Sequence, residues 1–182
     1  TGRHHWQNKQ AGQHASSWMK EFIPFVDLLK ANGYHTGFTG KGVDPFRYAQ
    51  NEKDSLWRKE NAAGHAYNKY RYTKNDSSDP RTAGGIGLID YFSNFHDFMQ
   101  QRKPDQPFYF WYGSTEPHRA YEKGSWKRNG KELVQVDVPG FFPDTDEIKG
   151  DMLDYAVEIE WADSHLYKML NYLDSIGELD NT

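Results

Sequence analysis

Three side chains in this sequence stand where an anion would be bound: Lys41, His118 and Arg119. His118 and Arg119 come shortly after residues 107–113, in which a proline precedes five consecutive aromatic residues. Such a run is typical of a strand buried on both faces of a parallel sheet. Lys41 follows a second strand-like stretch, residues 34–40. Because ligands of open α/β sheets bind beyond the carboxyl ends of strands, we expect Lys41 and His118 to grip one tetrahedral anion there.

The elements that would carry these residues follow in order. We expect a helix over 23–32, a strand over 34–41, a helix over 86–102, the aromatic strand over 107–113 and a long helix over 144–177. Pro24 suits the first turn of the first helix, and Gly33 suits the position after its end. Phe25, Val26, Leu28 and Leu29 would form its apolar face, and Ile89 would open the face of the second helix. Helix, glycine and strand in this order predict a layered α/β fold with a central sheet flanked by helices.

The stretches between these elements are irregular. Residues 1–20 predict a loop with short helical turns, and residues 43–85 predict a long excursion that includes a short hairpin. In a second excursion, residues 120–143, Val134, Val136 and Val138 alternate and favour brief strand pairing.

The last helix has the strongest signals. Its apolar residues keep a period of about 3.6, and Asp144 with Glu147 suits a capping box at its start. We expect Asp154 and Glu158 to lie on solvated faces of this helix, and His165 to be structural.

Composition narrows the class of protein. The 182 residues are enough for one domain with a sizeable core, although apolar residues make up only 36%. Aromatic residues reach 16%, a mixture common in carbohydrate-handling proteins. The net charge of −4 gives no indication of a nucleic-acid partner, and no apolar run approaches the roughly 20 residues of a membrane span. Without cysteine, these residues form no disulfide or thiolate metal site.

Several short motifs match known functional patterns only in part. The glycine-rich run 84–87 lacks the preceding strand and the spacing of a dinucleotide loop, and residues 17–20 fit Ser-x-x-Lys without its companion motifs. No carboxylate or histidine pair has the spacing of a metal site, so we assign no metal ligand. His5 and His65 stay open as sugar contacts.

Taken together, the motifs resemble those of the type I sulfatases. Residues 33–41, Gly-Tyr-His-Thr-Gly-Phe-Thr-Gly-Lys, resemble the second signature of that family, and Glu116–Arg119 resemble its Pro-His motif. Residues 1–3, Thr-Gly-Arg, resemble the end of the first signature. Within the family, the likeness is to bacterial heparan N-sulfatases and sulfamidases. It rests on Gln7-Asn8, on residues 61–68 and on residues 138–143.

The resemblance implies an alkaline-phosphatase-like α/β fold, a formylglycine nucleophile and a bound Ca²⁺. The resemblance also implies that the chain, 1–182, is an internal fragment of the N-terminal catalytic domain. The nucleophile would precede Thr1, and the remaining metal ligands would lie before Thr1 and after Thr182. The chain alone is then expected to be inactive, and the parent protein to be periplasmic or secreted. Many sulfatases have a histidine one or two residues after this lysine, whereas here Gly42 and Val43 follow.

The resemblance also implies roles for the three side chains. Lys41 would place a positive charge against the sulfuryl oxygens, His118 would give a hydrogen bond or proton to the sulfate or leaving group, and Arg119 would bind an anionic sugar. A plain surface lysine and a structural ion pair are the alternatives for Lys41 and Arg119. Arg3 would brace the nucleophile loop.

We therefore expect a hydrolase of sulfated glycans, acting on the N-sulfoglucosamine of heparan-type chains. An O-sulfatase on another glycan and a non-catalytic sugar-binding module are the alternatives. The expected partner is a sulfated carbohydrate, without nucleic acid or membrane. Exposed edges of a truncated sheet would also favour a homodimer.

Overall fold

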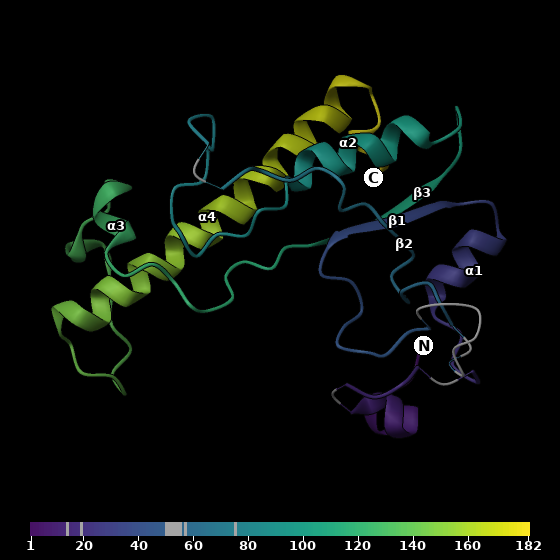
Figure 1. The fold of residues 1–182 in the computed structure, drawn as a ribbon, viewed down its shortest axis with the longest axis horizontal. Helices are drawn as coiled ribbons and strands as arrows, with labels where there is room; N and C mark the ends of the chain where they lie inside the picture. The colour runs from purple at the N-terminus through teal and green to yellow at the C-terminus, as the bar shows by residue number, and fades with distance from the viewer. Residues whose placement is uncertain (14, 19, 50–55, 57, 75) are drawn as a thin grey trace. The chain divides into compact units, whose positions relative to one another are not determined.

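The computed structural model describes residues 1–182 except 14, 19, 50–55, 57 and 75 (Figure 1). By its internal contacts the chain divides into two compact units. The first comprises Thr1–Tyr70 with Ser93–Gly113, and the second comprises Arg71–Phe92 with Ser114–Thr182.

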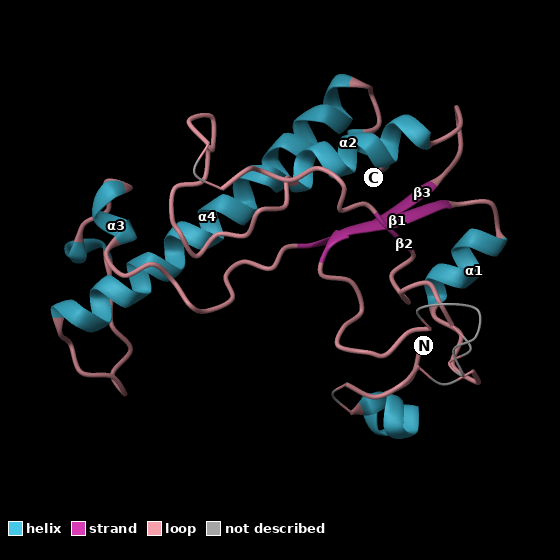
Figure 2. Cartoon of the chain, in the orientation of Figure 1, coloured by secondary structure: helices cyan, strands magenta, loops and turns pink. Residues whose placement is uncertain are grey.

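A parallel three-stranded sheet organises the first unit (Figure 2). Its order is β2-β1-β3, with β1 at His35–Gly40, β2 at His65–Ala66 and β3 at Phe108–Gly113. The register pairs His35 with Phe108 and Gly40 with Gly113, so β1 and β3 end together. The α/β prediction and both predicted strands are confirmed.

Burial differs between the two long strands. Four central residues of β1 are buried, because β2 and β3 flank that strand. All six residues of β3 are only half-buried. The prediction that the aromatic strand is covered on both faces is therefore wrong. Among the described strands β3 is an edge, and its large rings keep part of their surface exposed.

Two helices belong wholly or partly to this unit. Helix α1, Phe25–Ala31, begins after Pro24 as predicted, but only Val26 is buried, while Phe25 and Leu28 remain 47% and 55% exposed. The predicted apolar face is thus too wide. Helix α2, Tyr91–Gln101, begins five residues later than predicted and leaves out Ile89, which pairs with Arg71 in an isolated antiparallel bridge.

The predicted excursions contain other elements than expected. Within 43–85, strand β2 pairs in parallel with β1, and the antiparallel pairing within the described part of this stretch is limited to an isolated bridge between Asn61 and Gly64. Residues 50–55, 57 and 75 of this prediction lie outside the described residues. Near the N-terminus, a 3-10 stretch at His5–Gly12 agrees with the expected helical turns.

The second unit is built on helix α4, Asp146–Ser175. Helix α3, Ser125–Arg128, and a 3-10 turn at Leu133–Gln135 both contact it, and α3 lies beside its N-terminal part in Figure 1. The predicted strand pairing around Val134 is wrong, since this side chain is 83% exposed within the 3-10 turn.

The start of α4 also differs from the prediction. Thr145 is the N-cap, and its hydroxyl accepts a hydrogen bond from the Ile148 amide at 3.4 Å. Asp144 instead forms an ion pair with Lys149 at 2.7 Å. The predicted capping box, Asp144 with Glu147, is therefore wrong.

Two acidic residues of α4 are buried, contrary to the prediction of a solvated face. Asp154 accepts hydrogen bonds from the Gly124 amide at 2.8 Å, the Ser125 hydroxyl at 2.7 Å and the Trp126 amide at 2.9 Å. Its carboxylate thereby caps α3, which has no side-chain cap of its own. Glu158 is fully buried as well.

Candidate functional site

Lys41 comes directly after β1, in the first unit. Its backbone amide donates a hydrogen bond to the carbonyl of Gly113 at 2.6 Å, which joins the ends of β1 and β3. The side chain is exposed, and its ammonium group has no hydrogen bond or ion pair within the described residues. The structure thus presents an uncompensated positive charge at the carboxyl end of a parallel strand, where anionic ligands are expected.

Asparagine side chains fix the backbone on both sides of Lys41. Asn68 Oδ1 accepts the amide of Gly40 at 2.7 Å, and its Nδ2 donates to the carbonyl of Gly40 at 3.2 Å. Asn61 Oδ1 accepts the amide of Val43 at 2.9 Å. Because residues 40 and 43 are both held, the loop that carries the lysine is preorganised.

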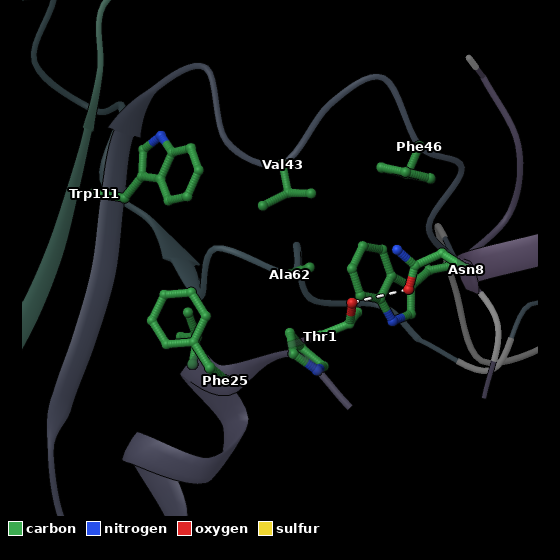
Figure 3. A pocket seen from close by; sticks show the side chains of 10 residues that line it. Thr1, Asn8, Phe25, Val43, Phe46, Ala62 and Trp111 are labelled. Carbon is green, nitrogen blue, oxygen red and sulfur yellow. Dashed lines mark hydrogen bonds between the residues drawn. The ribbon is translucent and has the colours of Figure 1, made fainter. Parts of the chain in front are cut away.

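A cavity of about 230 Å³ lies beside this loop (Figure 3). Val43 lines it together with Phe25 of α1 and Trp111 of β3. Thr1 also lines it, and the Thr1 hydroxyl donates to Asn8 Oδ1 at 2.8 Å. Thr1, from the segment that resembles the end of the first signature, and Val43, from the loop after Lys41, therefore line one pocket.

His118 lies in the second unit, in a segment anchored by the buried carboxylate of Glu116. Glu116 Oε2 accepts hydrogen bonds from the hydroxyls of Tyr91 at 2.6 Å and Ser114 at 2.7 Å. Burial opposes ionisation of this carboxyl, but the hydrogen bonds outweigh it and lower the pKa of Glu116. A carboxylate whose charged form is favoured by its hydrogen bonds thus stands two residues before His118.

The glycine-rich run 84–87 supports the same segment. The Gly87 amide donates to Glu116 Oε1 at 2.7 Å, and the Gly84 amide donates to Glu122 Oε2 at 2.6 Å. Two carboxylates that flank His118 in sequence are therefore bound by one short loop. These contacts also explain why helix α2 starts late, since residues 84–87 are held outside it.

The ring of His118 is exposed and is oriented by its own turn. Its backbone amide donates to the Thr115 carbonyl at 3.0 Å, and Nδ1 lies 2.6 Å from the Arg119 carbonyl oxygen. Because a carbonyl only accepts, Nδ1 must carry the proton. Nε2 is left for a ligand, where it accepts a proton when the ring is neutral and donates one when the ring is charged.

Arg119 forms a bidentate ion pair with Asp151, at 2.9 Å and 2.5 Å. Its guanidinium also lies 4.6 Å from the ring centre of Tyr121. These residues line a cavity of about 620 Å³ that also contains Trp126 and Lys127. The ion-pair alternative for Arg119 is therefore present in the structure, within a pocket large enough for a sugar.

The remaining predicted residues lie in several places. The guanidinium of Arg3 is 5.2 Å from the ring centre of Phe22, and both Arg3 and His5 are exposed. His65 is exposed in β2. Lys41 belongs to the first unit, whereas His118 and Arg119 belong to the second. The contacts given above for each of these side chains lie within its own unit.

Sequence reasoning missed four polar residues that shape these sites. Asn61 and Asn68 belong to a segment that resembles the N-sulfatases, but nothing in the sequence predicted their hydrogen bonds. Glu116 entered the sequence analysis only as part of the Pro-His motif. Glu158 has both carboxyl oxygens buried without a hydrogen-bond partner among the described residues. Burial, followed by the charge of Glu116, raises the pKa of Glu158 to about 7, whereas the charge of His118 lowers it.

Comparison with known families decides the membership of the chain. Residues 3–182 match the family model described as Sulfatase. The chain belongs to the sulfatase family. The predicted family and the alkaline-phosphatase-like α/β fold are thereby confirmed, and sulfate ester hydrolysis is the general activity of this family. A comparison with curated proteins finds no match.

The Ca²⁺ and formylglycine of this family do not fit the residues described here. No group of three or more histidine, cysteine, aspartate or glutamate side chains in the described part of the chain is placed to hold a metal ion. The sequence contains no cysteine, and no serine in it stands in the Cys/Ser-x-Pro-Ser-Arg context of the first signature. We therefore derive no chemical step through either group. No helix among the described residues is long and apolar enough to cross a membrane.

Proposed function

We propose that the protein containing this chain releases sulfate from sulfated glycans, with the N-sulfoglucosamine of heparan-type chains as substrate. The observation that carries the proposal is the free ammonium group of Lys41 on a loop fixed at Gly40 and Val43. A preorganised positive charge stabilises the negative charge that develops in the transition state, and this is usually the largest electrostatic contribution to such catalysis.

In this proposal, Lys41 and His118 act on one tetrahedral anion. Lys41 stabilises charge on the sulfuryl oxygens, and the free Nε2 of His118 gives a hydrogen bond or proton to the leaving atom. The fixed Nδ1 contact supports that role, because it orients the ring and leaves Nε2 without a hydrogen-bond partner among the described residues. The nucleophile is supplied from outside the residues described.

The proposed sugar contacts lie in the cavity that begins at Arg119. Tyr121 and Trp126 offer ring surfaces to a pyranose, and the exposed Lys123 and Lys127 offer charges to its sulfate or carboxylate groups. Arg119 reaches an anionic sugar by exchanging Asp151 for the ligand. This chemistry favours an acidic glycan over a neutral one.

Sulfate release from two substrates tests the proposal. The full-length protein is incubated with N-sulfoglucosamine and with glucosamine 6-sulfate, and free sulfate is measured by ion chromatography. Release from the first supports the N-sulfatase assignment. Release from the second alone would identify an O-sulfatase, and binding of both without release would identify a sugar-binding module.

A double-mutant cycle tests whether the two cations share one anion. Lys41→Ala and His118→Ala should each lower kcat/KM by at least about a hundredfold, and the double variant should lose much less than the product of the two. Lys103→Ala, an exposed lysine in the same unit as Lys41, is the control. Losses that multiply would show that the two side chains act independently.

The localisation and the oligomeric state of the protein are also proposals. We propose that the parent protein is periplasmic or secreted, as sulfatases commonly are, and that fractionation of cells would recover it there. A homodimer through the sheet edges stays a prediction, which the mass of the protein in solution would test.

A further inference from the structure

The backbone of Asn61 is held by a buried polar network in the first unit. Its carbonyl accepts the Gly64 amide at 2.9 Å and Nη2 of Arg58 at 3.1 Å. Arg58 is itself buried and forms a bidentate ion pair with Asp27. Such a doubly anchored residue has little freedom to move, which is the requirement for a preorganised ligand.

The side chain of Asn61 is equally fixed. Oδ1 accepts two backbone amides, those of Val43 and Ala63, each at 2.9 Å. Since two donors point at this atom, it must be the oxygen, and the orientation of the carboxamide follows. The two N–H groups of Nδ2 have no hydrogen-bond partner among the described residues.

This carboxamide lies against the residue that follows Lys41. A Cβ added at Gly42 would come within 2.7 Å of both Nδ2 and Oδ1 of Asn61. Only glycine at position 42 therefore lets the amide approach the loop. Residue 42 is one of the two positions, one or two residues after the lysine, at which many sulfatases have a histidine.

We propose that Asn61 is a further anion-binding residue of the Lys41 site, whose Nδ2 donates a hydrogen bond to an oxygen of the sulfate group. The choice of sulfate as the ligand rests on the proposed function. The position of the donor rests on the fixed carboxamide of Asn61. Asn61 thus occupies the space that a side chain at residue 42 would need, and its Nδ2 lies against the residue that follows Lys41. Removal of one such preorganised donor lowers turnover by roughly 10²–10³-fold in other enzymes.

Asn61→Asp isolates this donor in the full-length protein. An aspartate keeps an oxygen for the amides of Val43 and Ala63, so the unfolding midpoint in urea should stay within experimental error. Inhibition by inorganic sulfate should weaken at least about tenfold, and kcat/KM should fall about 10²–10³-fold. The deficit relative to wild type should shrink at acid pH, where a protonated carboxyl regains a donor, and a purely structural role would not produce this recovery.

Asn68→Asp is the matched control, because it adds the same charge near Lys41 but removes a donor already bound to the Gly40 carbonyl. It should lower stability, unlike Asn61→Asp. Sulfate inhibition and turnover of Asn61→Asp equal to those of wild type at neutral pH would overturn the proposal.

A measurement without a variant covers the case in which Asn61→Asp does not fold. In wild-type protein labelled with ¹⁵N-asparagine, inorganic sulfate should shift the side-chain NH₂ resonance of Asn61. An unshifted resonance at saturating sulfate would refute the role. If sulfate shifts this resonance while no glycan releases sulfate, the proposed function fails and the anion-binding role of Asn61 stands.

Discussion

Replacing Gly113 by alanine should disable the lysine site through a backbone contact. Gly113 ends β3, and a Cβ built there would lie 1.8 Å from the carbonyl oxygen of Lys41 and 2.8 Å from its carbonyl carbon. A carbon and an oxygen in contact need about 3.3 Å. One strand end must therefore move by about 1.5 Å, and the moving part is backbone, which cannot rotate away as a side chain would.

The expected cost has a structural and a functional part. Overpacking of this kind destabilises by about 1–3 kcal/mol, and weakening the 2.6 Å bond between the Lys41 amide and the Gly113 carbonyl adds about 1 kcal/mol. We therefore expect a loss of about 2–4 kcal/mol in the free energy of unfolding. A displacement of about 1 Å at a catalytic group can cost about a hundredfold in rate, so kcat/KM should fall at least that far.

Urea denaturation and sulfate release measure the two parts. Gly140→Ala is the matched control, because a Cβ at Gly140 meets nothing within 4 Å and should change neither quantity. If Gly113→Ala has wild-type stability and activity, β1 and β3 do not meet as closely as described, and the argument that this contact positions Lys41 is refuted.

Three further predictions concern buried carboxylates. Glu116→Gln should lower stability by about 1.5–3 kcal/mol at neutral pH, because an amide would face the Tyr91 hydroxyl that now donates to a carboxylate; urea unfolding at pH 7 measures this. Asp154→Ala should cost about 3 kcal/mol, since three donors around α3 lose one buried acceptor, and thermal unfolding should reveal it. Burial raises the pKa of Glu158 from 4.5 to about 7, so the folded state binds the proton more tightly and wild-type stability should fall as pH rises from about 4.5 to 7. Glu158→Gln should remove that fall, so the variant should be more stable than wild type by up to about 3 kcal/mol at pH 8 and differ little from it at pH 4. Equal pH dependence of the free energy of unfolding in the two proteins would refute this prediction.

The elements that sequence predicted well are those set by local signals. Pro24 and Gly33 bound α1, and the aromatic run gave β3 within one residue. The carboxyl ends of β1 and β3 also meet as predicted, because parallel strands in register bring residues 40 and 113 together. Placement of Lys41 at a strand end followed from that rule alone.

The elements that sequence missed depend on distant partners. Periodicity alone assigned Asp154 and Glu158 to solvent, because it cannot show that α3 would bring unpaired amides to the face of Asp154. The start of α2 was predicted too early for a related reason. The amide of Gly87 is bound by Glu116, which lies 29 residues away, and no local propensity reports such a bond.

The same distinction separates the chemical groups of the Lys41 site from the residues that position them. A charged residue after a strand can be recognised in the sequence, because its residue type indicates its chemistry. The roles of Asn61 and Asn68 cannot be recognised in this way, because the role of an asparagine outside regular structure depends on its hydrogen-bond partners. Both lie more than 15 residues beyond Lys41, yet their amides fix Val43 and Gly40. Asn61, before β2, and Asn68, just after it, thus both return to the backbone around Lys41, and Nδ2 of Asn61 is left as a donor against Gly42.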